Sequence, residues 1–212
     1  MVPGWEVHIL DDENQPMDPP SLGKVALKCP PPPSFMLTLW GNDDAFVEKY
    51  FSDSPGYYTT GDAGYMDENG YLHIMTRVDD VINTAGHRLS TGRFEEVINE
   101  HPLIVESAVI GLWDEVRGDQ PFALVIPALG VEYNEDDLKK EIIAKVRSDI
   151  GAFARLGGLI IVSKLPKTRS GKILRGTIKK IANKKNFTTP ATIEDESVLD
   201  ELKDKIGEAL GH

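Results

Sequence analysis

The chain has 212 residues, a formal net charge of −11 and an apolar fraction of 41%, which is ordinary for a globular protein. No apolar run approaches the roughly 20 residues that cross a bilayer, and the first residues lack the basic flank and apolar core of a signal peptide. The single cysteine, Cys29, excludes an internal disulfide and suits a reducing compartment.

Charge is distributed unevenly and indicates where the chain divides. Residues 1–78 hold 4 basic and 12 acidic residues, residues 79–187 hold 17 and 15, and residues 188–212 hold 2 and 7. The sign of the net charge therefore changes near residue 79 and again after Lys185. Between Lys164 and Lys185 there are nine basic residues and no acidic one, which fits either a phosphate-binding surface or a solvated helix face.

The first 80 residues predict short strands joined by turns. Apolar runs that alternate or end at prolines predict the strands, and Asn69-Gly70 is a hairpin signal. The expected elements are strands over 5–10 and 24–29, a break at prolines 30–33, an amphipathic helix over 43–51, and a strand–turn–strand unit over 56–82.

Beyond residue 80 the pattern becomes mixed α and β. An asparagine cap and acids in the first turn predict one helix with particular clarity. In chain order we expect a helix over 90–101, strands over 104–113 and 120–129, the capped helix over 134–150, a strand over 157–166 and a basic helix over 173–185. Helices then cover one small sheet, so the fold class is α+β.

The segment "LPKTRSGKILR" (165–175) looks like the end of a phosphate-binding loop but is not one. A P-loop reads G-x-x-x-x-G-K-[ST], with backbone amides on the phosphates and a hydroxyl on magnesium. Pro166 takes the place of the first glycine and has no amide hydrogen, and Ile173 takes the place of the hydroxyl residue. Lys172 therefore needs another explanation.

Four segments in order resemble the late motifs of adenylate-forming acid–CoA ligases, most closely the acetyl-/propionyl-CoA synthetases. They are "YYTTGD" (57–62), "GYLHIMTRVDDVINTAGHRL" (70–89), "FEEVINEHP" (94–102) and "LPKTRSGKILR" (165–175). The resemblance implies that residues 1–78 are the C-terminal remnant of a large AMP-binding domain. It also implies that residues 79–187 are a mobile lid domain of mixed α/β structure, followed by an acidic tail over 188–212.

The resemblance also implies a two-step ligase. A carboxylate attacks the α-phosphate of ATP to give acyl-AMP and pyrophosphate, and the thiol of CoA then displaces AMP, with the lid rotating between the steps. The implied cofactors are ATP/AMP, CoA and Mg²⁺. The implied partners are a short-chain carboxylate, ATP and CoA, together with enzymes that acetylate or deacetylate Lys172; neither nucleic acid nor a membrane is expected.

Site residues follow from the same resemblance, residue by residue. Lys172 is the expected catalytic residue, because a compact ammonium group between carboxylate and α-phosphate stabilises the charge of the transition state. The other expected roles are nucleotide binding by Asp62, Arg77 and Arg88, CoA binding by Ala85, Gly86 and Arg147, a hinge at Asp79, and metal binding by His101.

Two other functions stay open at this point. The chain could be a stand-alone nucleotide- or CoA-binding module without turnover, or a nucleic-acid binder that uses the 164–185 stretch. The second is disfavoured because the chain is acidic overall and no aromatic residues alternate with that stretch. The 212 residues alone are expected to be inactive, and an intracellular location, cytoplasmic or mitochondrial, is expected for the whole enzyme.

Overall fold

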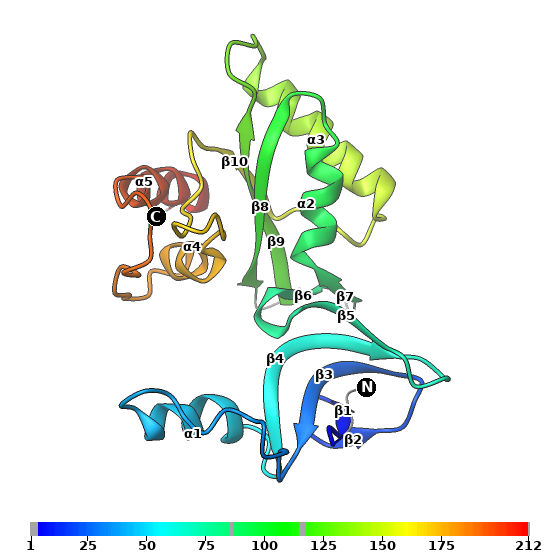
Figure 1. Ribbon diagram of the computed structural model, residues 1–212. Helices are drawn as coiled ribbons and strands as arrows, with labels where there is room; N and C mark the ends of the chain where they lie inside the picture. The colour runs from blue at the N-terminus through cyan, green and yellow to red at the C-terminus, as the bar shows by residue number, and fades with distance from the viewer. Residues whose placement is uncertain (1–3, 85–86, 115–117, 212) are drawn as a thin grey trace. The chain divides into compact units, whose positions relative to one another are not determined.

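A computed structural model describes residues 4–84, 87–114 and 118–211 of the chain. The chain forms two compact units, Met1–Asp79 and Asp80–His212, which are coloured from blue to cyan and from green to red in Figure 1. Within the described ranges, no helix combines the length and the apolar character that a membrane crossing requires. The predicted α+β class is confirmed.

The first unit is an antiparallel sheet with the strand order β2-β1-β3-β4-β5. Its strands are β1 (Val7–Leu10), β2 (Pro16–Met17), β3 (Ser21–Lys28), β4 (Tyr57–Met66) and β5 (Leu72–Arg77). Helix α1 (Asp43–Phe51) precedes β4 and begins at Asn42, whose side chain accepts a hydrogen bond from the Ala45 N–H at 3.1 Å. Only Ile9, Val25 and Met66 form the buried cluster of this sheet among the described residues.

The second unit has a sheet with the order β10-β9-β6-β7, and β8 pairs with β9. Its strands are β6 (Val81–Thr84), β7 (His87–Ser90), β8 (Ile104–Asp114), β9 (Gly118–Pro127) and β10 (Gly158–Ile161). All neighbours are antiparallel except β9 and β10, which run parallel. Its helices are α2 (Thr91–Asn99), α3 (Glu135–Asp149), α4 (Arg175–Ala182) and α5 (Val198–Leu210).

Both faces of the central parts of β8 and β9, residues 108–111 and 121–125, are buried, which explains why the residues there are apolar on both faces. Ala108 and Ile110 belong to the core cluster formed with α4 and α5, whereas Val109 between them belongs to the cluster formed with α2 and α3. Figure 1 shows the same division, with α2 and α3 on one side of the hairpin and α4 and α5 on the other. The second unit is therefore a three-layer structure with two cores.

Local signals explain where the helices of this unit begin. The Asn134 side chain accepts from the Asp137 N–H at 3.1 Å, and Gly151, at φ 132°, follows the end of α3. The side chain of Ser90 caps α2 in the same way, accepting from the Arg93 N–H at 3.1 Å. The basic helix is shorter than the expected 173–185 and runs only from Arg175 to Ala182.

Helix α5 was not expected from the sequence, which indicated only an acidic tail over 188–212. Val198, Leu202 and Ile206 follow one another at four-residue intervals and are all buried in the core with α4. Gly211 ends the helix in the left-handed conformation, at φ 70°. The acidic residues lie on the other face of the helix. The net negative charge of the segment therefore indicated only a tail, although the segment also has an apolar face.

Candidate functional site

Two of the expected nucleotide-binding residues meet in the first unit. Asp62 on β4 lies opposite Arg77 on β5, and Arg77 Nη1 donates to Asp62 Oδ1 at 3.0 Å and to the carbonyl of Thr60 at 2.9 Å. Gly61, which precedes Asp62 within β4, is needed there because its φ is 77° and a Cβ atom would overlap the Arg77 guanidinium. Both side chains stay open to solvent, at 32% and 45% exposure, so they remain accessible to a ligand.

Asp79 lies in the short 3₁₀ turn η1 (Val78–Asp80), where the two compact units divide. Its side chain is 79% exposed, and its nearest ionic partner is Arg77 Nε at 3.6 Å. Because Asp79 is exposed and has one long ion pair among the described residues, its backbone angles can change at little cost. The hinge role stays a prediction.

Lys172 lies in a hairpin whose backbone is well connected. The Thr168 N–H donates to the carbonyl of Lys172 at 2.8 Å, and the Lys172 N–H donates to Thr168 Oγ1 at 3.1 Å. Gly171, at φ 83°, makes the turn, and its N–H donates to the Thr168 carbonyl at 2.8 Å. The Lys172 side chain is exposed, and no ion pair of its ammonium group occurs among the described residues. The hairpin thus presents a free positive charge from a defined backbone.

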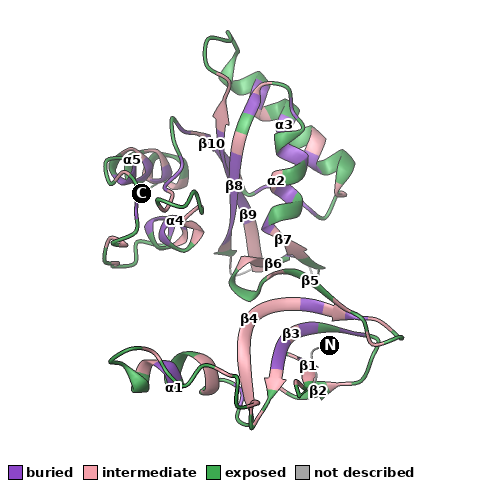
Figure 2. Ribbon diagram, in the orientation of Figure 1, coloured by how far each residue is buried: buried purple, intermediate pink, exposed green. Residues whose placement is uncertain are grey.

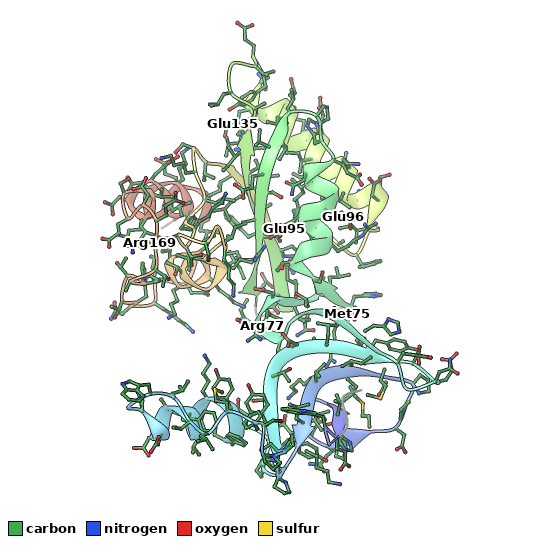
Figure 3. The ribbon with its side chains drawn as sticks, in the orientation of Figure 1. Met75, Arg77, Glu95, Glu96, Glu135 and Arg169 are labelled. Atoms are coloured by element: carbon green, nitrogen blue, oxygen red, sulfur yellow. The ribbon has the colours of Figure 1, made fainter. Side chains whose placement is uncertain are left out.

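The basic stretch 164–185 separates into two kinds of residue. Lys164 pairs with Asp195 at 3.3 Å, and Lys167 pairs with Glu106 at 2.7 Å. Arg169, labelled in Figure 3, lies on the hairpin with Lys172, and within the described chain it has no carboxylate partner. Cations at the base of the hairpin therefore hold the fold, whereas those at its tip are available to an anion.

Sequence reasoning missed the ion pair that anchors the hairpin to helix α2. Arg175, three residues after Lys172, donates from Nε and Nη2 to the two carboxylate oxygens of Glu95 at 2.9 and 2.7 Å. Glu95 also accepts from the Val109 N–H at 2.9 Å, so it joins α2, β8 and the start of α4. Burial lowers the pKa of Arg175, but the hydrogen bond and charge of Glu95 outweigh it, and the pKa ends above its ordinary value.

The structure describes only some of the remaining site residues, which are the three expected to bind CoA and the nucleotide-binding Arg88. Ala85 and Gly86 fall outside the described residues. Arg88 lies on β7 opposite Asn83, and Arg147 lies in the last turn of α3; both side chains are exposed. The nucleotide-binding role of Arg88 and the CoA-binding role of Arg147 stay predictions.

A ring pair that the sequence did not indicate lies at the start of β7. His87 stacks on Phe153 with ring centroids 4.2 Å apart and planes at 17°. Phe153 follows the end of α3, and the bare backbone of Gly151 leaves room for its ring. The pair joins the strand after residues 85–86 to the loop after α3.

The observed contacts of His101 are with other parts of the protein. The ring is buried, Nδ1 accepts from the Leu103 N–H at 3.3 Å, and Nε2 lies 3.0 Å from Glu141 Oε2. Magnesium prefers oxygen ligands, and both ring nitrogens of His101 already have protein partners. Across the described ranges no group of three or more His, Cys, Asp or Glu side chains is arranged to hold a metal ion. These side chains do not fit the expected metal role of His101.

Comparisons of sequence and structure identify the class of enzyme. Residues 93–172 match the AMP-binding enzyme C-terminal domain. The acetoacetyl-CoA synthetase of Streptomyces lividans shares the fold, with a TM-score of 0.79 and 21% identity over 94% of this chain and 30% of that one. The anthranilate CoA ligase AuaEII, solved with anthranoyl-AMP, has a TM-score of 0.66 and 28% identity over 84% and 33%. Residues 93–172 thus contain the AMP-binding enzyme C-terminal domain, and the chain is similar to the C-terminal part of adenylate-forming enzymes.

Among curated proteins, the homologues of this chain are short-chain acyl-CoA synthetases. The mitochondrial acyl-CoA synthetase short-chain family member 3 of Rattus norvegicus is 44% identical over 99% of this chain and 31% of its own length. Family member B of Dictyostelium discoideum is 45% identical over 95% and 29%. The acetyl-coenzyme A synthetase of Pyrobaculum aerophilum is 38% identical over 95% and 30%. The chain thus spans less than a third of the length of each of these relatives.

Proposed function

We propose that this chain is the C-terminal portion of a short-chain acyl-CoA synthetase, an acetate/propionate–CoA ligase. A carboxylate oxygen attacks the α-phosphorus of ATP, and the bond to the leaving pyrophosphate breaks to give acyl-AMP. The sulfur of CoA then attacks the acyl carbonyl, and AMP leaves as the thioester forms. The support is the match to the AMP-binding C-terminal domain and to the relatives that span the chain.

The observation that carries the proposal is the hairpin of Lys172. Its backbone is fixed by internal hydrogen bonds, whereas its ammonium group is exposed and has no acidic partner within the described residues. A positioned, unpaired cation stabilises charge that develops where a carboxylate meets the α-phosphate. Acetylation of Lys172 would remove that charge, so enzymes that add or remove acetyl groups are expected to regulate it.

The other site residues take roles around the nucleotide and CoA. Asp62 accepts hydrogen bonds from the ribose hydroxyls, while Arg77 offers its remaining guanidinium hydrogens to ribose and phosphate oxygens. Arg88 reaches the nucleotide phosphates when the lid turns at Asp79. In that second state, Arg147 meets the phosphates of CoA; Ala85 and Gly86, which are also expected to bind CoA, lie outside the described residues.

The proposal predicts that activity requires the longer protein. The complete enzyme should catalyse carboxylate-dependent exchange of labelled pyrophosphate into ATP with acetate or propionate, and should form the thioester when CoA is added. The 212-residue chain alone should bind adenosine nucleotides weakly and release no AMP above a no-protein control. Carboxylate-dependent AMP release by that chain, or no exchange with any short-chain acid in the complete enzyme, would contradict the proposal.

A further inference from the structure

The C-terminal segment crosses the base of the Lys172 hairpin. The Arg169 N–H donates to the carbonyl of Thr192 at 3.0 Å. Two residues on, the Glu194 N–H donates to the carbonyl of Lys167 at 2.9 Å. Between these bonds Thr168 forms an antiparallel bridge with Ile193. Residues 192–194, which lie beyond the matched 93–172 domain, therefore pair with the first arm of the hairpin through two backbone hydrogen bonds and one isolated bridge.

The crossing segment is itself held to the core. Ile193 is 4% exposed and belongs to the cluster that α4 and α5 form with the sheet. On its C-terminal side, helix α5 is tied to the strand end after β10, because Glu201 accepts from the Ser163 N–H at 3.0 Å. Lys205 Nζ also donates to the carbonyl of Ile161 at 2.7 Å. The segment thus connects the hairpin to a well-buried part of the unit.

The hydrogen bonds within the hairpin and those to residues 192–194 restrain different parts of the hairpin. The internal bonds fix Lys172 relative to Thr168, and the bridge at Ile193 fixes Thr168 relative to the core. The tip itself is exposed at Ser170 and Gly171 and has no packing of its own. Among the described residues, contacts at its two ends therefore restrict where it stands: the Arg175–Glu95 pair holds the second arm, and residues 192–194 hold the first together with the Lys167–Glu106 ion pair.

We propose that residues 192–194 are a positioning element for Lys172 in the adenylation step. The inference rests on the proposed function, in which Lys172 contacts two oxygens in that step. A displacement of about 1 Å in such a geometry can cost on the order of 10² in rate. The thioester-forming step does not use Lys172, so it does not need the element.

One substitution removes a bond of this element and leaves its side-chain packing alone. Glu194 is exposed, and proline in its place lacks the N–H that binds Lys167. Proline also requires an extended residue before it, and Ile193 already lies in a strand-like bridge. Glu194→Ala is the matched control, because it removes the same side chain but keeps the N–H.

In the complete enzyme, Glu194→Pro should lower kcat of carboxylate-dependent pyrophosphate exchange by about 10- to 100-fold relative to Glu194→Ala. The KM for ATP should not change. Thioester formation from supplied acyl-AMP and CoA should be equal in both variants, which also checks that the lid is folded. Equal exchange rates in the two variants, or parallel loss of both half-reactions in Glu194→Pro, would overturn the proposal.

A second measurement does not depend on catalysis. In the 212-residue chain, amide hydrogen exchange of Arg169 and Lys172 should be faster in Glu194→Pro than in Glu194→Ala, with unchanged exchange in β8 and β9. Unaltered exchange at the hairpin would overturn the positioning element even if the unmodified enzyme were active. No pyrophosphate exchange by the unmodified enzyme, together with faster hairpin exchange, would instead refute only the proposed function and leave the bracing by residues 192–194 supported.

Discussion

The two units bury their side chains in different ways. Among described residues, the first unit has a cluster of three buried apolar side chains, whereas the second has clusters of fifteen and fourteen. Figure 2 shows the difference directly, since buried positions concentrate in the second unit. In the first unit Leu37 is 92% exposed and Trp40 is fully exposed. The second unit therefore has its own core, whereas the first has little buried apolar surface, and we expect the first unit to be unstable alone.

The two units also differ in how they hold their candidate site residues. Asp62 and Arg77 are neighbours on one sheet and fix each other through a single ion pair. Lys172 is held by contacts from residues distant in the chain, on α2 and in the C-terminal segment. A charge that acts in one step and then leaves the site needs a rigid carrier. In the proposed function, the second unit is that carrier.

The largest expected effect concerns independent folding. Residues 80–212 expressed alone should unfold cooperatively in urea, because both core clusters lie within them. Residues 1–79 alone should show no cooperative transition, because fewer than about 80 residues with so small a core rarely fold without support. Circular dichroism during urea titration tests both pieces. A cooperative transition of residues 1–79 would contradict the claim that only the second unit has a core large enough to fold alone.

A smaller effect is expected at the Glu95–Arg175 pair. Glu95→Ala should destabilise the second unit by about 3 kcal/mol, the low end for losing one partner of a buried pair, because these side chains are 12% and 22% exposed. Glu96, beside it in Figure 3, is 62% exposed in its pair with Arg93. Glu96→Ala should therefore change stability by only about 0.5 kcal/mol or less. Urea unfolding compares the variants, and equal losses would show that Glu95 is not an anchor.

The smallest effect is the pH dependence of helix α5. Burial raises the pKa of Glu201, but hydrogen bonds from Ser163 and the charge of Lys205 outweigh it, so the pKa lies below its ordinary 4.5. A carboxylate with a lowered pKa stabilises the fold above 4.5 and loses that contribution as pH falls through the folded-state pKa.

Glu201→Gln should consequently cost about 1 kcal/mol or less at neutral pH. The difference from the unmodified chain should disappear as the pH is lowered below the folded-state pKa. Thermal unfolding at a series of pH values measures it, with the exposed Glu208→Gln on the same helix as control. A difference that persists in acid would show that the glutamate charge does not hold the helix.

Much of the fold could be predicted from local signals. The capping residue Asn134 indicated where helix α3 begins, and two apolar runs indicated strands β8 and β9. Both signals depend only on residues that are close together in the sequence. Helix α5 was missed because its apolar stripe, Val198 to Ile206, stands in an acidic segment. The short 3₁₀ turn at Asp79 gave no pattern beyond an acidic pair.

The candidate site was predictable only in part. The resemblance to family motifs indicated Asp62 and Lys172, because each lies within a short motif that can be recognised from consecutive residues. The partners that hold the Lys172 hairpin are far from it in sequence. Glu95 is 80 residues from Arg175, and residues 192–194 come only after helix α4 has ended. Such contacts depend on tertiary packing, and no spacing in a single sequence reveals them.

The most direct test compares both half-reactions in Lys172→Ala of the complete enzyme. Carboxylate-dependent pyrophosphate exchange should fall by about 10²- to 10³-fold, equivalent to roughly 2.7–4 kcal/mol, the usual loss on removing a positioned electrostatic donor. Thioester formation from added acyl-AMP and CoA should be retained, and thermal stability should not change. Arg169→Ala, which removes a neighbouring exposed cation, should keep most of the exchange activity. Equal loss of both half-reactions in Lys172→Ala, or an unfolded protein, would contradict the account.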